Sequence, residues 1–326
     1  MKVWQCDDSR PVPRLVPAEV ETPQPGPGEV LVRVHAVGVT PTELSWQPTT
    51  HTKSGENRRH AIPAHEFSGT IAAVAAGADG AVGDEVFGMN DWYAQGATAE
   101  YCCALASALA PRPARLTHVE AASVPIAALT AWQGLFERAR LQAGERVLIH
   151  GGAGAVGVFA IQLACRRGAH VLTTASGRDR DFLLRLGAQQ VIDYHTERFE
   201  DVARNVDVVF DTVGGSTLQR SRDVLGPGGR LVTIVSTVES PDDELAALEG
   251  RARPRQAYFI VEPNRQQLCD IAAMLDAGQL QPVVSAVLPF ARAAAAYAHE
   301  PMRNRRPGKT VVTVIPPGEP SGEETP

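Results

Sequence analysis

The chain has 326 residues, of which 44% are hydrophobic, and this length and composition suit a globular protein of two domains and exclude a largely disordered chain. No apolar run approaches the roughly 18 residues of a membrane span, and the start MKVWQCDDSR carries acids where a signal peptide is apolar, so we expect a cytoplasmic protein without a membrane partner. The net charge of −6 is modest and the arginines are interleaved with acids, which argues against a nucleic-acid partner.

The first third of the chain is predicted to be rich in short antiparallel strands. Residues 28–39 (GEVLVRVHAVGV) alternate apolar and polar side chains, and similar patterns recur at Thr70–Ala75 and Thr98–Ala104. Turns rich in proline and glycine separate these segments. The pattern indicates a barrel-like domain.

From about residue 121 the pattern changes to strands that alternate with helices. Apolar runs fit strands buried on both faces of a parallel sheet, and they are Arg146–His150, His170–Thr174, Val206–Asp211 and Arg230–Val235. The segments Val156–Arg167 and Asp179–Leu186 between them are predicted helices that cover the sheet. The expected fold class is therefore α/β, with a doubly wound parallel sheet of the Rossmann type.

The last part of the chain is expected to return to the first domain. A final sheet strand at Gln256–Val261 and a helix at Asn264–Gly278 precede Pro282–Phe290, which resembles the strands of the first domain. The end, 316–326, is rich in proline, glycine and acids and is predicted to be a disordered tail. The expected domains are a barrel-like substrate domain, 1–121 with 261–326, and a dinucleotide-binding domain, 122–260.

The clearest chemical signal is a glycine-rich turn between a strand and a helix. In ERVLIHGGAGAVGVFAIQLA, Gly152, Gly154 and Gly157 form a GxGxxG pattern that permits a sharp turn, close approach of a diphosphate and tight packing of the helix. Such turns also occur without a ligand, but the buried strand before it and the amphipathic helix after it favour a dinucleotide. The residues expected along the diphosphate are Gly152, Ala153, Gly154, Ala155, Val156 and Gly157.

The end of the next predicted strand favours NADPH over NADH. An NAD enzyme carries an acid there, whereas this chain has TASGRDR, starting at Thr174. Ser176 can donate a hydrogen bond to a 2′-phosphate, and Arg178 can form a charge-assisted pair with it. The alternative is that Arg178 and Arg180 only begin a surface helix beside Asp179.

Several separated segments match one protein family. They are GATAEYCCA, AASVPIAALTAWQGL, the glycine turn GAGAVG, GAQQVIDY, FDTVGG and PGKTVVTV. In order and spacing they resemble the medium-chain dehydrogenase/reductase superfamily, specifically its zinc-free quinone oxidoreductase branch, to which zeta-crystallin belongs. The resemblance implies a GroES-like first domain, a Rossmann second domain, and a homodimer that forms by edge pairing of the strand at Gln256–Val261.

The resemblance also implies where the cofactor lies. It places Thr130 beside the nicotinamide and Tyr194 near the adenosine 2′-phosphate. The further positions that it places along the cofactor are Val213, Val235, Phe259 and Val261.

The same resemblance argues against a catalytic zinc ion. Zinc alcohol dehydrogenases bind the metal through a cysteine, a histidine and a second cysteine, and this chain has Thr40, His65 and Ile126 at those positions. One ligand cannot hold a catalytic zinc, which needs about three protein donors. We therefore expect no metal and interpret His65 as a structural residue. The cysteines lack a paired CxxC spacing and are expected to be reduced thiols.

Without zinc, the favoured chemistry is hydride transfer to a conjugated acceptor. Hydride added to a quinone or an activated C=C bond pushes charge onto a remote carbonyl oxygen, which amides, a hydroxyl or water can stabilise. We therefore predict an NADPH-dependent reductase with a small-molecule substrate. The alternatives are a tailoring enoyl reductase with a dedicated, carrier-bound substrate, and a structural or redox-sensing protein that binds NADPH without turnover.

Loop residues of the first domain are expected to shape the substrate pocket, namely Thr40, Trp46, His51, Trp92 and Tyr93. Tyr93 is the candidate proton donor, and the alternative is that it only forms a wall of the pocket. The loop from Ser45 to Ile62 is longer than is usual in the family. We interpret it either as a specificity element or as an ordinary surface excursion.

Overall fold

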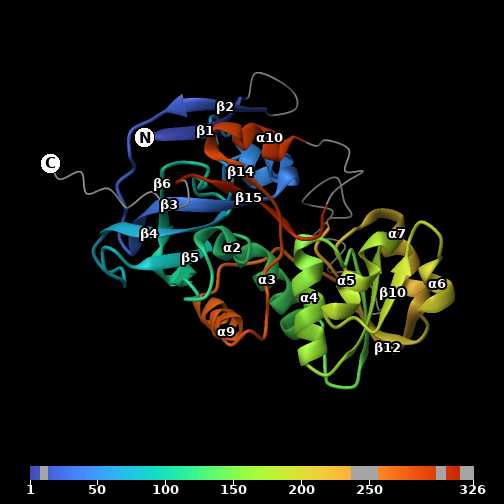
Figure 1. Cartoon of the computed structure of the whole chain (residues 1–326). Helices are drawn as coiled ribbons and strands as arrows, with labels where there is room; N and C mark the ends of the chain where they lie inside the picture. The colour runs from blue at the N-terminus through green and yellow to red at the C-terminus, as the bar shows by residue number, and fades with distance from the viewer. Residues whose placement is uncertain (8–13, 236–255, 299–305, 316–326) are drawn as a thin grey trace. The chain divides into compact units, whose positions relative to one another are not determined.

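The computed structural model divides into two compact units, which are described separately (Figure 1). Unit 1 comprises Met1–Ile126 and Glu262–Pro326, and unit 2 comprises Ala127–Val261. The predicted tail, 316–326, lies outside the described residues. The described residues are 1–7, 14–235, 256–298 and 306–315.

Unit 1 contains a mixed sheet and a separate hairpin. The hairpin strands are β1 (Lys2–Asp7) and β2 (Arg14–Glu19). The sheet strands are β3 (Glu29–Val39), β4 (Glu66–Val74), β5 (Glu85–Met89), β6 (Tyr101–Leu105), β7 (Leu109–Pro111), β14 (Val284–Pro289) and β15 (Lys309–Thr313). Their order is β14-β15-β3-β4-β5-β7, with β6 paired to β3, and every pair except β14 with β15 is antiparallel.

The core of unit 1 follows from the alternation in β3, which corresponds to the strand predicted at 28–39. Val30, Val32 and Val34 point to one side of the strand and are fully buried. They belong to one apolar cluster with Phe67 of β4 and Tyr297. The helices around this sheet are α1 (Gln47–Thr50), α2 (His118–Ala122), α9 (Arg265–Asp276) and α10 (Ala293–Tyr297).

Unit 2 is built on a parallel sheet. Its strands are β8 (Arg146–His150), β9 (His170–Ala175), β10 (Gln190–Asp193), β11 (Val206–Asp211), β12 (Leu225–Thr233) and β13 (Gln256–Tyr258). They follow the order β10-β9-β8-β11-β12-β13. The strand order reverses between β8 and β11, and open α/β sheets bind ligands at such a point, outside the carboxyl ends of the strands. The predicted doubly wound α/β fold is confirmed.

The helices of unit 2 surround this sheet (Figure 1). They are α4 (Ala155–Arg166), α5 (Arg180–Arg185), α6 (Phe199–Val202) and α7 (Gly215–Arg220), and α3 (Pro125–Trp132) spans the boundary between the units. Among the described residues, no helix has the length and apolar character needed to cross a membrane.

Besides shifts of one residue at β9 and α4, three elements of unit 2 differ from their predicted bounds. β12 begins at Leu225, earlier than the predicted Arg230, because a strand here accommodates the residues GPGG that normally indicate a turn. β13 ends at Tyr258 rather than at Val261. The helix predicted to begin at Asp179 begins instead at Arg180, as α5, and a short 3-10 turn, Gly177–Asp179, precedes it.

Candidate active site

The glycine turn of unit 2 joins the end of β8 to the start of α4. A Cβ atom at Gly157 would overlap the carbonyl oxygen of Gly151, and one at Gly152 would overlap the hydroxyl oxygen of Thr173. Gly151 itself has a φ of +76°, a left-handed conformation that favours glycine. Side chains at these positions would therefore force the turn open.

The start of α4 offers backbone donors to an anion. Gly154 is the N-cap residue and has no side chain with which to cap the helix. The first N–H groups of a helix lack partners within it and lie at the positive end of its dipole. The N–H of Gly154 donates to the carbonyl oxygen of Gly151 at 2.9 Å, whereas Ala155 and Val156 are half-buried at the helix start, so a ligand can reach their N–H groups. These residues fit a dinucleotide diphosphate, which requires close backbone approach together with N–H groups at a helix start.

A buried histidine supports the glycine turn. His150 ends β8, and its Nδ1 lies 3.1 Å from Oγ1 of Thr174, while its Nε2 lies 2.9 Å from Oγ of Ser221. The Thr174 hydroxyl also accepts a hydrogen bond from the backbone N–H of Gly151 at 3.3 Å. Burial lowers the pKa of His150 to about 4. The ring is therefore neutral near pH 7 and acts as a hydrogen-bonded support.

The FDTVGG turn after β11 is fixed by the buried carboxylate of Asp211. Its oxygens accept hydrogen bonds from the backbone N–H groups of Val213 at 3.1 Å and Gly214 at 3.0 Å, and from the Thr233 hydroxyl at 2.9 Å. The Thr233 hydroxyl in turn accepts from the backbone N–H of Val235 at 3.1 Å. Val213 and Val235 therefore lie at the same carboxyl edge of the sheet as the glycine turn.

The residues predicted to bind a 2′-phosphate follow β9 and β10, which are neighbours in the sheet. Ser176 is half-buried directly after β9. The Arg178 side chain is 46% exposed, and its Nε lies 3.7 Å from the carboxylate of Asp179. Tyr194, after β10, is 60% exposed, and its ring contacts that of His195. The three predicted residues are therefore accessible to a ligand.

One acid at this edge was missed by the sequence reasoning. A Cβ atom at Gly177 would overlap the carboxylate of Asp193, which ends β10 and accepts a hydrogen bond from the backbone N–H of His195 at 3.1 Å. That backbone hydrogen bond lowers the pKa of Asp193, so the group is charged at neutral pH. Only the pairing of β10 with β9 brings it next to Gly177, and a sequence pattern cannot supply that pairing.

The remaining predicted cofactor residues are buried. Thr130 on α3 is 3% exposed, and Phe259 and Val261, which follow β13, are 5% and 6% exposed. The Arg138 guanidinium lies 5.7 Å from the centre of the Phe259 ring. Packing alone explains such burial, so contact of these side chains with a cofactor stays a prediction.

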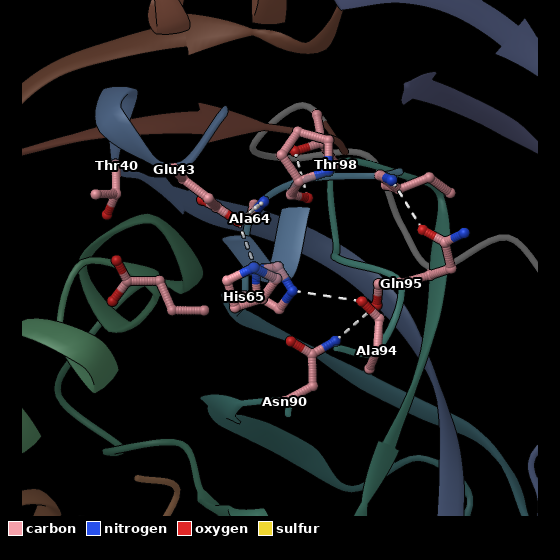
Figure 2. Close-up of polar contacts among 12 residues, drawn as sticks. Thr40, Glu43, Ala64, His65, Asn90, Ala94, Gln95 and Thr98 are labelled. Atoms are coloured by element: carbon pink, nitrogen blue, oxygen red, sulfur yellow. Dashed lines mark hydrogen bonds and ion pairs between the residues drawn. The ribbon is translucent and has the colours of Figure 1, made fainter. Parts of the chain in front are cut away.

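Polar residues of unit 1 gather around His65 (Figure 2). The His65 Nδ1 is hydrogen-bonded to the carboxylate of Glu43, and both side chains are 1% exposed. The same Glu43 oxygen accepts from the backbone N–H of Ala64 at 2.9 Å. The His65 Nε2 lies 3.4 Å from the carbonyl oxygen of Ala94. Glu43 therefore fixes both the ring and the chain before β4.

Two of the predicted pocket residues pack against this histidine. The Trp46 and Trp92 rings meet edge to face with centroids 5.3 Å apart, and the Trp92 ring lies 5.3 Å from that of His65. Both indoles are only half-buried. They form an aromatic surface that the long 45–62 loop supplies in part.

The other predicted pocket residues are held by that loop. The Lys53 ammonium lies 5.3 Å from the centre of the Tyr93 ring, and His51 Nδ1 lies 2.9 Å from Oγ1 of Thr50. Tyr93 lines a cavity of about 520 Å³, together with Lys53 and Arg58 of the loop. Tyr93 is thus a wall of this cavity in the structure, and its role as a proton donor stays a prediction.

An ion pair is buried beside Thr40. The Lys309 ammonium pairs with the carboxylate of Glu66 and donates a hydrogen bond of 2.8 Å to Oγ1 of Thr40. The other Glu66 oxygen accepts from the backbone N–H of Ile126 at 2.9 Å. Burial raises the pKa of Glu66, and the Lys309 charge opposes that shift. Lys309 was not among the predicted site residues, although a lone lysine in the buried strand β15 was an available signal.

These residues do not fit a catalytic zinc ion. Thr40 presents an alcohol, His65 a single imidazole and Ile126 a hydrocarbon, whereas zinc needs about three nitrogen, sulfur or carboxylate donors. Within the described part of the chain, no three or more His, Cys, Asp and Glu side chains are grouped so as to hold a metal ion. The Lys309 ammonium also places a positive charge next to Thr40.

Comparison with known families finds two matches along the chain. Residues 26–114 match the family described as alcohol dehydrogenase GroES-like domain, and residues 186–312 match the one described as zinc-binding dehydrogenase. The second range includes neither Thr40 nor His65. The words "zinc-binding" in that family description therefore say nothing about metal ligands at these two positions.

Individual proteins match over most of the chain. The zebrafish (Danio rerio) protein named NAD(P)H oxidoreductase RTN4IP1, mitochondrial, is 31% identical over 89% of this chain and 84% of its own. The tomato (Solanum lycopersicum) 2-methylene-furan-3-one reductase is 29% identical over 97% of this chain and 80% of its own. The solved structure of the quinone oxidoreductase from Coxiella burnetii is 30% identical, with a TM-score of 0.83, and the match covers 96% of this chain and 99% of that chain.

The zebrafish match corrects the expected cytoplasmic location, because that relative is named as mitochondrial. The expectation rested on an acidic start and on the lack of a long apolar run, which bear on secretion and on membrane insertion. Neither feature separates the cytoplasm from the mitochondrion. The prediction of a cytoplasmic location is therefore wrong.

Proposed function

We propose that this chain, which belongs to the medium-chain dehydrogenase/reductase superfamily in its zinc-free quinone oxidoreductase branch, reduces quinones or enones with hydride from NADPH. The chain is an oxidoreductase that uses a nicotinamide cofactor. Three parts of this function are proposals: that NADPH is the hydride donor, that the acceptor is a conjugated compound, and that the reaction needs no zinc.

The glycine turn at the β8–β11 reversal point carries this proposal. It combines positions where only glycine avoids overlap with a helix start that has no side-chain cap. His150 and Asp211 hold the two loops on either side of that point through buried hydrogen bonds. These contacts support the proposal that a diphosphate binds at this turn, where a dinucleotide would be anchored.

Ser176, Arg178 and Tyr194 support the choice of NADPH. The Ser176 hydroxyl and the Arg178 guanidinium are accessible donors, and a phosphate accepts several charge-assisted hydrogen bonds. The Asp193 carboxylate opposes an anion at this edge, but backbone N–H groups already neutralise part of its charge. Arg178 lies near Asp179 and Arg180 pairs with Glu197, and these two arginines supply the positive charge near the proposed 2′-phosphate position.

The class of hydride acceptor follows from the side chains of unit 1, which do not fit a catalytic zinc ion. When bound, NADPH supplies the hydride, and the acceptor must then hold a negative charge that no zinc ion stabilises. A quinone or an enone spreads that charge to a carbonyl oxygen, where a hydroxyl suffices. The half-buried indoles of Trp46 and Trp92 offer an apolar aromatic surface against which such a planar molecule can pack.

The position of β13 in the unit 2 sheet supports a homodimer. Among the described strands, β13 pairs with β12 and is the last strand of the sheet, and an edge strand can extend its sheet by pairing with a second copy. Light scattering of the purified protein is expected to give twice the mass of one chain. The mass of a single chain would contradict the dimer without affecting the proposed reaction.

A spectrophotometric screen tests the proposed reaction. Purified protein is mixed with NADPH or NADH and with a quinone, an enone or an enoyl thioester, and nicotinamide absorbance is followed. We expect faster consumption of NADPH than of NADH with a quinone or an enone, and no loss of rate after treatment with a zinc chelator. Turnover with the enoyl thioester alone would favour a dedicated enoyl reductase, and tight NADPH binding without any turnover would favour a structural or redox-sensing role.

A further inference from the structure

Thr40 and Lys309 place a polarised hydroxyl where zinc enzymes of the superfamily have a metal ligand. The Lys309 side chain is 6% exposed and its partner Glu66 is fully buried, so the pair is shielded from water. Thr40 is only half-buried, and its hydroxyl oxygen accepts the hydrogen bond from Lys309. A shielded charge acts on a neighbouring group more strongly than an exposed one, because water does not screen it.

The direction of the hydrogen bond between Lys309 and Thr40 is fixed by chemistry. An ammonium group has donors and no acceptor, so Lys309 donates and the Thr40 oxygen accepts. The Thr40 hydroxyl must then direct its own proton elsewhere. The nearby positive charge draws electron density from the oxygen and makes that proton a better hydrogen-bond donor.

We infer that the Thr40 hydroxyl donates a hydrogen bond to the carbonyl oxygen of the acceptor, and that Lys309 is the positioning residue that orients and polarises this hydroxyl. The inference rests on the proposed reduction of a conjugated carbonyl compound. It assigns to a hydroxyl and an ammonium the charge stabilisation that a zinc ion gives in the zinc branch.

The electron balance of the reduction shows what the hydroxyl does. The β-carbon of an enone gains a hydride from NADPH, and the C=C π pair moves so that the carbonyl oxygen becomes an enolate oxygen. The Thr40 hydroxyl stabilises that oxygen without giving up its proton. The α-carbon then takes a proton from water, and the acceptor has gained two hydrogen atoms while NADPH has become NADP⁺.

A purely structural role for the ion pair makes a different prediction. Glu66 holds the backbone N–H of Ile126 at the start of α3, so Lys309 stabilises the chain simply by balancing a buried carboxylate. In that case, loss of the Thr40 hydroxyl removes one hydrogen bond and changes stability alone. The binding of an oxygen anion to the protein would be unaffected.

A phenolate probe separates the two roles. The absorbance of 4-nitrophenolate responds to hydrogen bonding at its oxygen, and the anion resembles an enolate or a reduced quinone. The anion is titrated, with and without NADP⁺, into the native protein and into the variants Thr40→Ala and Thr40→Ser. It is also titrated into a double variant, Lys309→Met with Glu66→Gln, in which both charges of the buried ion pair are removed together so that neither is left unpaired. Thr42→Ala, an exposed threonine in the same turn, is the matched control. Neutral 4-nitroanisole reports any general change of the pocket.

We expect Thr40→Ala to weaken 4-nitrophenolate binding by about 10- to 100-fold, because a hydrogen bond to a charged group is lost. Thr40→Ser is expected to bind within about threefold of the native protein, and the double variant about 10-fold more weakly, since it keeps the hydroxyl but loses the polarising charge. Binding of 4-nitroanisole is expected to stay the same throughout. On an enone, Thr40→Ala is expected to lower kcat by about 100-fold and to leave the KM for NADPH unchanged.

Equal 4-nitrophenolate affinity for the native protein and Thr40→Ala would overturn the inference, as would a native protein that does not bind the anion at all. Equal enone turnover by these two proteins would overturn it while leaving the proposed reaction intact. A native protein that binds 4-nitrophenolate but consumes no NADPH with any acceptor would overturn the proposed function instead.

Discussion

The glycine turn of unit 2 and the polar cluster around His65 and Lys309 in unit 1 differ in how the chain encodes them. The turn is encoded by consecutive residues, 150–157, in which Gly151, Gly152 and Gly157 leave no room for a Cβ atom. The cluster is assembled from three segments that are far apart in the sequence. They contribute Thr40 and Glu43, then His65, and then Lys309, and they meet only through the pairing of β3, β4 and β15. A local backbone constraint is therefore visible in a sequence, whereas a long-range pairing of side chains is not.

The largest effect is expected from a substitution in the glycine turn, the site that is encoded locally. A methyl group at Gly157 would overlap the Gly151 carbonyl oxygen, so Gly157→Ala must open the turn. We expect a loss of about 3 kcal/mol in the free energy of unfolding, the upper range for overpacking, together with at least about 100-fold weaker NADPH binding. Chemical denaturation and calorimetric titration measure the two quantities.

Gly154→Ala is the matched control for that substitution. Its methyl group would meet only the Gly151 carbonyl oxygen, at 3.2 Å, so the protein without ligand is expected to keep its stability within about 0.5 kcal/mol. NADPH binding is still expected to weaken, because this residue faces the diphosphate. If both variants lost equal stability, steric packing of the turn would not be what the glycines provide.

The fold was predictable wherever burial and periodicity act locally. The bounds of β8 and β11 were found as predicted, because strands buried on both faces of a parallel sheet are continuous apolar runs. β12 was placed too late, since residues that usually form turns are held in this strand by its neighbour β11. Asp193 and Lys309 were missed for the same reason, because each acquires its role only from a strand that pairs beside it.

The second prediction concerns His150, which links the sheet to the turn. Its pKa is lowered to about 4, so between about pH 6.5 and 4 the unfolded chain binds a proton that the folded chain does not. Stability is thus fully present above about pH 6.5 and falls by about 3 kcal/mol as the pH approaches 4. Burial also lowers the pKa of His35 to about 4, so protonation of His35 adds to this loss of stability at acid pH.

The variant His150→Asn isolates that contribution. An amide keeps hydrogen-bonding capacity without titrating, so the slope of unfolding free energy against pH between 6.5 and 4 is expected to decrease by about one proton. Denaturation series at several pH values measure this slope. The exposed His195→Asn serves as the control, and an unchanged slope in His150→Asn would show that this ring is already charged in the folded protein.

A smaller effect is expected at the adenosine end of unit 2, where sequence and structure both contribute. Arg178→Ala removes an accessible guanidinium but leaves Asp193 in place, so the KM for NADPH is expected to rise about 10-fold while that for NADH stays nearly constant. The variant Asp193→Asn should have the opposite sign and improve the use of NADPH. Equal changes for both cofactors in Arg178→Ala would remove the assignment of a 2′-phosphate site.

The smallest effect is expected at Tyr93 in unit 1. The sequence predicted Tyr93 as the proton donor, whereas it predicted Thr40 only as a pocket residue. Tyr93 lines a cavity beside Lys53, whereas Thr40 receives a hydrogen bond from a buried ammonium. Tyr93→Phe keeps the ring that forms the wall and removes only the hydroxyl, so turnover on an enone is expected to stay within about twofold of the native rate. Steady-state rates for Tyr93→Phe and Thr40→Ala on one enone make the test. A loss at Tyr93 that exceeds the loss at Thr40 would transfer the role of hydrogen-bond donor from the hydroxyl held by Lys309 to the phenol.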